Sequence, residues 1–243
     1  MKHIQYNSRT VFHVHTFRCG HAEMTEDEEY IKRSLELGAE DIWFTDHIPF
    51  PGDEINSRMK LNDLPEYMDT LKRLQKKYEG IISVHIGLEA EYIPSYLDYY
   101  KKLVSDPDIE LLMLGQHLFE MSDGNYNYTL PEDEWHSTEM EGCGNAMIEA
   151  FQTGLFSVCA HPDRIFRYKG SWDDEMDMLA RKIISTAAEN NIILEKNMSS
   201  LVKPNCFRPE FWTLVPEDYP VIKGLDAHTV SQLDRFNDDR NDQ

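Results

Sequence analysis

The chain has 243 residues, of which 41% are hydrophobic and 11% aromatic, as expected for a globular protein with a full core. Acidic residues number 44 against 24 basic ones, and this net charge of −20 argues against nucleic acid as a partner, because such binding depends on Lys and Arg. The sequence has neither an apolar run long enough to cross a membrane nor an apolar segment of the signal-peptide type near its start.

The four cysteines, Cys19, Cys143, Cys159 and Cys206, are scattered singly, and no two form a CxxC pair. In a chain of this size they indicate reduced thiols, so we expect a cytoplasmic protein. No linker or change in composition divides the chain, which predicts a single domain over residues 1–243 with a polar, frayed tail from about Asp234. The sequence leaves the oligomeric state open.

The first third of the chain alternates between strand and helix patterns. Residues 10–15, 40–46 and 81–88 are rich in β-branched and aromatic side chains and are predicted to be strands. Between the first two, Thr25 and Glu28 have the spacing of a capping box and predict a helix that ends at Gly38. Between the second and third, Asp63 is expected to cap a helix that runs to Tyr78 with 3.6-residue apolar spacing.

The same alternation continues to the end of the chain. We expect helices over residues 95–104, 139–153 and 172–190, and strands over 109–115, 156–160, 192–197 and 220–226. Residues 119–135 are polar and are predicted to form an extended loop. Seven strands separated by helices favour a parallel sheet that is closed, or nearly closed, into a barrel with the helices outside.

Side chains of the metal-binding type recur where the predicted strands end. On the first strand, His13 and His15 alternate with Val14 and therefore share one face of the strand. The whole set comprises His13, His15, His21, His47, Glu89, His117, His161, Asp226 and His228. Because the carboxyl ends of the strands form one rim in a parallel barrel, these residues are expected to converge.

Nine such side chains are too many for one ion but suit two or three divalent metal ions that share carboxylates. Imidazole-rich sites favour Zn, Mn or Fe over Ca and Mg, which prefer oxygen ligands. Clusters of divalent ions lower the pKa of bound water and hold the oxygens of a transferring phosphoryl group. The pattern therefore indicates metal-dependent hydrolysis, a chemistry that suits phosphoryl transfer.

The ordered motifs HxH, DH, GLE, GQH, AHPD and DAH resemble those of the polymerase and histidinol phosphatase (PHP) family, most of all its histidinol-phosphate phosphatases. The resemblance runs from His13 to His228 and implies an α/β fold, a distorted (β/α)7 barrel with its metal site at the C-terminal rim of the strands. It also implies three ligand sets, namely His13, His15, Glu89 and Asp226; His21, His47 and His228; and Glu89, His117 and His161. Glu89 would then bridge two ions.

The resemblance further implies a phosphoric monoester hydrolase that converts L-histidinol phosphate into L-histidinol and phosphate in histidine biosynthesis. A hydroxide bridging the metals would attack phosphorus, and Asp226 or His228 would relay a proton to the leaving alkoxide. Two alternatives stay open. One is a PHP phosphatase for another small phosphomonoester or for phosphotyrosine, and the other is a non-catalytic, metal-binding regulatory module.

Substrate contacts are expected from cationic and acidic residues near the same strand ends. Arg164 and Arg167 follow the AHPD motif and Arg18 lies in the first loop, so all three are candidates to hold the phosphate, with Arg164 as a catalytic residue. Each could instead be a solvated surface arginine. Glu91 follows Glu89 by two residues and is a candidate partner for an ammonium or imidazole group of the substrate.

Overall fold

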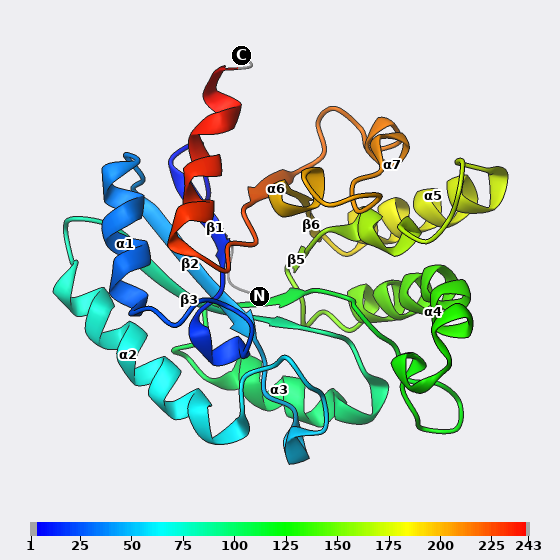
Figure 1. The fold of residues 1–243 in the computed structure, drawn as a ribbon, viewed down its shortest axis with the longest axis horizontal. Helices are drawn as coiled ribbons and strands as arrows, with labels where there is room; N and C mark the ends of the chain where they lie inside the picture. Colours follow the sequence, from blue (N-terminus) through cyan, green and yellow to red (C-terminus); the bar gives the residue numbers. More distant parts are fainter. Residues whose placement is uncertain (1–3, 242–243) are drawn as a thin grey trace. The chain divides into compact units, whose positions relative to one another are not determined.

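The computed structural model describes residues 4–241, in which strands and helices alternate along the chain (Figure 1). The strands are β1 (Thr10–Val14), β2 (Asp41–His47), β3 (Ser83–Ala90), β4 (Leu111–Leu114), β5 (Val158–Cys159), β6 (Ile193–Asn197) and β7 (Val221–Gly224). The α-helices are α1 (Asp27–Glu36), α2 (Leu64–Lys77), α3 (Leu97–Ser105), α4 (Glu132–Gln152), α5 (Asp174–Glu189), α6 (Met198–Leu201) and α7 (Pro209–Thr213). Among the short 3-10 helices, η1 (Phe17–Cys19) lies between the candidate ligands His15 and His21, and η6 (Pro162–Phe166) directly follows His161.

The seven strands belong to one sheet and lie in it in chain order, with parallel pairing of β1 with β2, β2 with β3, β4 with β5 and β5 with β6. The segment after β7 pairs with β1, because Leu225 N donates to Phe12 O at 2.8 Å and Ala227 N donates to His13 O at 3.0 Å. Parallel strands in chain order, with helices between them and the chain end returning to the first strand, confirm the predicted distorted (β/α)7 barrel.

The chain divides into two compact units. Within the described residues, one unit comprises 4–89, 106–111 and 223–241, and the other comprises 90–105 and 112–222. We call them the first and the second unit. That the whole chain acts as a single domain stays a prediction.

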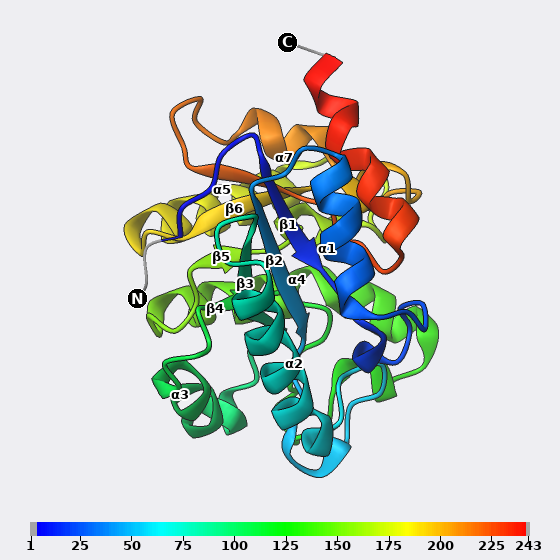
Figure 2. The same ribbon diagram turned by 90° about the vertical axis from the view of Figure 1, so that its left-hand side faces the viewer.

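In the first unit, α1 and α2 each bury apolar side chains at helical spacing. Tyr30 and Ile31 of α1 and Tyr67 of α2 are fully buried. The last 3-10 helix, η7 (Val230–Asn241), lies beside α1, where Arg33 Nη2 contacts Asp234 Oδ1 at 2.6 Å (Figure 2). The predicted frayed tail is therefore wrong for most of its length, because the helix continues to Asn241; the last two residues lie outside the described part.

In the second unit, α4 and α5 pack side by side (Figure 1). Gly144 of α4 allows the close approach, because a Cβ atom there would lie 2.9 Å from Leu179 Cδ2. Helix α4 begins seven residues before the predicted start, so the loop predicted over 119–135 is wrong for its last residues. Pro131 and the acidic residues that follow it mark this start, because they suit the positive end of a helix dipole.

Two smaller expectations need correction. The predicted capping box is wrong, because α1 begins at Asp27 with Glu26 as its N-cap and Thr25 lies one residue too early. Asp63 does stand at the N-cap of α2, but its side chain makes no capping hydrogen bond there. The short helices α6 and α7 have too few turns to show a periodic pattern in the sequence. Within residues 4–241, none of the helices is both long and apolar enough to span a bilayer.

Candidate metal centre

The site begins at the end of β1, where His13 and His15 are both fully buried. The register between β1 and β2 shifts between Val11 and Val14, and His13 has a φ of 67°, so β1 carries a bulge at this histidine. The bulge turns the two imidazoles toward each other, and their Nε2 atoms lie 2.9 Å apart. Simple alternation along a regular strand predicts a shared face but not this convergence.

Two carboxylates complete the group around these imidazoles. Glu89, near the end of β3, places Oε2 3.5 Å from His13 Nε2 and 3.5 Å from His15 Nε2. Asp226, in the segment after β7, places Oδ1 3.8 Å and 3.4 Å from the same two nitrogens. Four ligands about 2.0–2.1 Å from a tetrahedral zinc ion stand about 3.3 Å apart, so this donor set fits one divalent ion.

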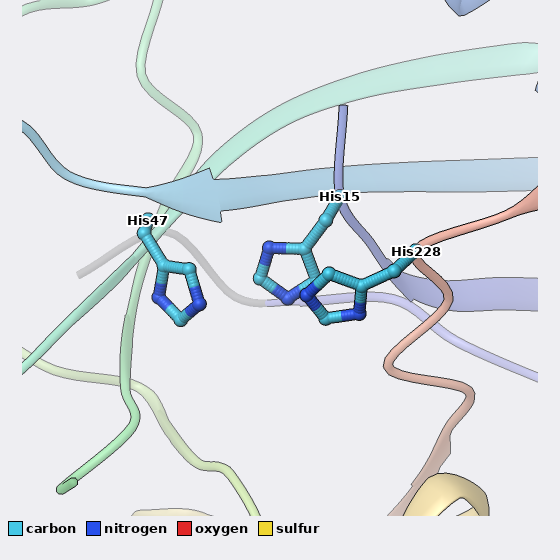
Figure 3. Close-up of side chains that lie close together, drawn as sticks. All are labelled: His15, His47 and His228. Carbon is cyan, nitrogen blue, oxygen red and sulfur yellow. The ribbon is translucent and has the colours of Figure 1, made fainter. Parts of the chain in front are cut away.

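Three further histidines lie next to this group. Figure 3 shows His15, His47 and His228 turned toward one another, and one donor atom from each lies within 4.8 Å of the others. The ring of His21 lies 4.4 Å from that of His228 and 5.4 Å from that of His47, measured between centroids. Glu89 Oε2 is 3.0 Å from His47 Nδ1, so this carboxylate faces both groups of histidines.

The hydrogen bonds of two of these histidines leave Nε2 available as a ligand. His21 Nδ1 lies 3.1 Å from Cys19 O, and His228 Nδ1 lies 3.1 Å from Asp226 O, so each Nδ1 carries the proton. His228 Nε2 is buried and has no hydrogen-bond partner among the described residues. Burial and the neighbouring His15 lower the pKa of His228 to about 3, which keeps its imidazole neutral as a metal ligand requires.

The carboxylate of Asp226 is ionised as well. Burial acts to raise its pKa, but the hydrogen bond with His15 and the charge of His13 outweigh burial and hold the pKa well below its usual value. An ionised Asp226 and a neutral His228 suit metal binding, and their part as proton relay stays a prediction.

Sequence reasoning missed Asp46, which directly precedes His47 at the end of β2. Asp46 is fully buried, and its Oδ1 lies 3.5 Å from His15 Nδ1. A carboxylate behind a ligating histidine fixes the ring and its tautomer. The signal in the sequence was the position of Asp46 next to His47 at the end of a strand. Neighbouring residues of a strand point in opposite directions, so Asp46 points away from the direction of His47.

In the second unit, His117 and His161 face each other with ring centroids 4.9 Å apart. His117 Nδ1 lies 2.7 Å from Glu91 Oε1, and Glu91 is fully buried. Glu91 therefore orients His117, and its contact with a substrate ammonium or imidazole stays a prediction. His161 has a φ of 32°, and its backbone N donates to Glu195 Oε2 at 3.1 Å.

Arg164 and Arg167 differ in their partners. Arg167 Nη2 contacts Glu139 Oε2 at 2.7 Å, whereas Arg164 Nη1 is buried with no hydrogen-bond partner among the described residues. Burial, together with the neighbouring Arg167, lowers the pKa of Arg164. A buried guanidinium nitrogen without a hydrogen-bond partner calls for an anion, so half-buried Arg164 fits a phosphate contact better than a solvated surface position.

Arg18 is also buried, so it is not a solvated surface arginine either. Its Nε donates to Glu66 Oε2 at 2.5 Å and its Nη1 donates to Asp27 Oδ2 at 2.9 Å. These two carboxylates already occupy the guanidinium, which speaks against the predicted contact with phosphate.

Comparison with known proteins finds a matching domain family and individual related proteins. The profile of the PHP domain matches residues 12–199. The chain is 29% identical over 232 residues to a protein of Deinococcus radiodurans assigned as a histidinol-phosphatase, with 91% of this chain and 86% of the relative covered. It is 25% identical over 253 residues to the histidinol-phosphatase of Bacillus subtilis, with 91% of this chain and 94% of the relative covered.

Two solved structures share the fold. A protein of Listeria monocytogenes assigned as the histidinol phosphatase HisK has a TM-score of 0.77 and 20% identity, over 95% of this chain and 99% of that one. The histidinol phosphate phosphatase of Lactococcus lactis has a TM-score of 0.69 and 17% identity, over 96% of this chain and 93% of that one. The latter was crystallised with zinc, L-histidinol and phosphate.

Proposed function

The chain belongs to the PHP domain family, and on that basis we propose that it is a metal-dependent phosphomonoesterase that hydrolyses L-histidinol phosphate to L-histidinol and phosphate, a step of histidine biosynthesis. The observation that carries this proposal is the group formed by His13, His15, Glu89 and Asp226, whose donor atoms have the spacing of ligands around one ion. The names of the relatives and the ligands of the Lactococcus lactis structure support the choice of substrate.

The residues divide into those that would hold metals and those that would hold substrate. His13, His15, Glu89 and Asp226 would hold one divalent ion, and His21, His47 and His228 a second. We further propose His117 and His161 as ligands of a third ion, with His117 fixed by Glu91. Zinc is the first choice because of the imidazole-rich donor set, and Mn and Fe are the other candidates. When bound, such ions supply Lewis acidity toward phosphoryl oxygens and a nucleophile at neutral pH.

The chain's own residues supply binding and orientation. Arg164 Nη1 is a donor without a partner among residues 4–241, and it would bind a phosphate oxygen. Glu139 is buried and paired with Arg167, so it would fix the orientation of that guanidinium. Arg167 Nε is also buried and would be a second donor to the phosphate. Arg164, Arg167 and Glu139 together carry one net positive charge, which suits the phosphate rather than the cationic part of the substrate.

All four cysteines are buried free thiols. This supports, as part of the proposal, a protein that acts in the cytoplasm, where thiols stay reduced.

A panel of phosphomonoesters tests the proposed function. The protein is loaded with zinc, manganese or iron, and kcat/KM is compared for L-histidinol phosphate, phosphotyrosine and simple sugar and nucleoside phosphates. We expect L-histidinol phosphate to exceed the others by at least about 100-fold, a difference of about 2.7 kcal/mol in transition-state binding. A higher kcat/KM for another ester would reassign the substrate. A protein that holds metal and hydrolyses none of the esters would instead be a regulatory module.

A further inference from the structure

The first loop, between His15 and His21, contains an arginine that is fixed on three sides. Arg18 lies in η1, and its Nε and Nη2 donate to Glu66 of α2 at 2.5 and 3.1 Å. Its Nη1 donates to Asp27, the first residue of α1, at 2.9 Å. Two helices thus hold one buried guanidinium in place through charge-assisted hydrogen bonds.

The same guanidinium also contacts the metal centre indirectly. Arg18 Nη1 donates to Thr16 Oγ1 at 3.0 Å, and the Thr16 hydroxyl donates in turn to Asp46 Oδ2. The backbone N of Thr16 donates to the same oxygen at 3.3 Å. The other oxygen of Asp46 lies 3.5 Å from His15 Nδ1, on the side of the ring opposite to Nε2. Arg18, Thr16 and Asp46 therefore form a continuous chain that ends behind His15.

We propose that Arg18 is a positioning residue for the metal centre, which holds the ring of His15 in its metal-binding orientation through Thr16 and Asp46. The inference rests on the metal-binding part of the proposed function. The side chains of Arg18, Thr16 and Asp46 are buried, so water does not compete for the two hydrogen bonds that join them or for the 3.5 Å contact between Asp46 and His15. Losing the Thr16 hydroxyl leaves Asp46 Oδ2 with only the backbone N of Thr16, and losing Arg18 leaves that hydroxyl without its donor; either change loosens Asp46 and, with it, the orientation of His15.

The direction in which metal affinity changes when Arg18 is removed distinguishes a positioning role from a purely electrostatic one. Arg18 carries a positive charge near a site for cations, so its removal alone lowers the repulsion and tightens metal binding. Positioning predicts the opposite, because partners behind ligating histidines change metal affinity by about 10- to 100-fold when they are lost. A weaker affinity after removal of the charge is therefore specific to the positioning role.

The test measures zinc affinity by competition with a chromophoric chelator, without any substrate. We expect Arg18→Met and Thr16→Val each to weaken zinc binding by about 10- to 100-fold. Thr16→Ser keeps the hydroxyl and should bind zinc as the parent does. Arg33→Met is the charge control, because it removes one positive charge from a partly exposed arginine of the same unit whose partners are Glu36 and Asp234.

Circular dichroism of the metal-free variants establishes that they are folded. Arg18→Met leaves Asp27 buried without its cation, and if that variant does not fold, Thr16→Val decides alone, because it leaves Arg18 on Asp27 and Glu66. Unchanged or tighter zinc binding by the folded Thr16→Val and Arg18→Met variants would overturn the inference. A parent protein that binds no zinc, manganese or iron would instead overturn the proposed function itself.

Discussion

His13 Nε2 lies 2.9 Å from His15 Nε2, and both nitrogens face the carboxylates of Glu89 and Asp226. The four residues are brought together by a bulge in β1, by β3 and by the return of the chain end to β1. Because the folded chain assembles this donor set and an unfolded chain does not, metal binding is coupled to folding.

Metal removal should therefore lower the thermal stability. We expect excess zinc to raise the free energy of unfolding by about 2.7 kcal/mol when free zinc is 100 times its dissociation constant, and a chelator to reverse the gain. The measurement is the unfolding midpoint with and without zinc. In His13→Ala most of this zinc-dependent shift should disappear, and a full shift in that variant would show that the ion is held elsewhere.

Turnover should depend on the same histidine. His13→Ala is expected to lower kcat/KM for L-histidinol phosphate by more than about 1,000-fold, about 4 kcal/mol, because the ion that activates the phosphoryl group loses a ligand. The control is His85→Ala. His85 belongs to the same unit but stacks on Trp43 and contacts Glu110, so its replacement should leave kcat/KM within a few fold. Equal losses in both variants would point to a general effect on folding.

Arg164 should contribute to phosphate binding. Arg164→Met is expected to lower kcat/KM by about 100-fold and to weaken competitive inhibition by inorganic phosphate, because a charged hydrogen bond to the phosphate contributes about 1.5–3 kcal/mol. Arg164→Lys should recover part of the loss. Arg181→Met, which removes an exposed arginine of α5, provides the comparison. An unchanged inhibition constant for phosphate in Arg164→Met would remove Arg164 from the site.

The stability of the second unit should depend on the protonation of Asp163. Burial raises the pKa of this carboxyl to about 6, although its Oδ2 accepts hydrogen bonds from Arg208 N at 2.8 Å and Trp212 Nε1 at 3.0 Å. The folded state therefore holds the proton more tightly than the unfolded state. The stabilisation from this proton is complete below about pH 4 and is lost as the pH rises through 6.

Asp163→Asn tests this linkage, because the amide oxygen can still accept both hydrogen bonds and does not titrate. Relative to the parent, the variant should gain about 2 kcal/mol in free energy of unfolding between pH 4 and pH 7. Urea unfolding at the two pH values gives the difference. A difference between the two proteins that does not change with pH would show that Asp163 has an ordinary pKa.

The fold and most of the ligands could be predicted from the sequence, because both depend on regular patterns. Seven strand patterns recur with helix patterns between most of them, and His47, Glu89 and Asp226 come at or just after strand ends, where a parallel barrel gathers its functional residues. In the first unit the structure brings together all the candidate ligands that lie there. His117 and His161, which follow β4 and β5, come together in the second.

The rest depends on geometry that a linear pattern does not contain. The bulge that turns His13 toward His15 has no residue signature of its own, and the φ of 50° at Asp226 is unusual for a residue other than glycine. Arg18 illustrates the same limit. Its place in the loop suggested a phosphate contact, and only the folded positions of Asp27 and Glu66 show that its guanidinium is already paired with two carboxylates.

The release of inorganic phosphate from L-histidinol phosphate by the purified protein tests the central claim most directly. The parent is stripped of metal, assayed, reloaded with zinc or manganese and assayed again. We predict negligible release by the stripped protein and multiple turnovers after reloading, with none in His13→Ala under the same conditions. Release that is unaffected by metal removal, or no release by a protein shown to contain its metals, would contradict the account.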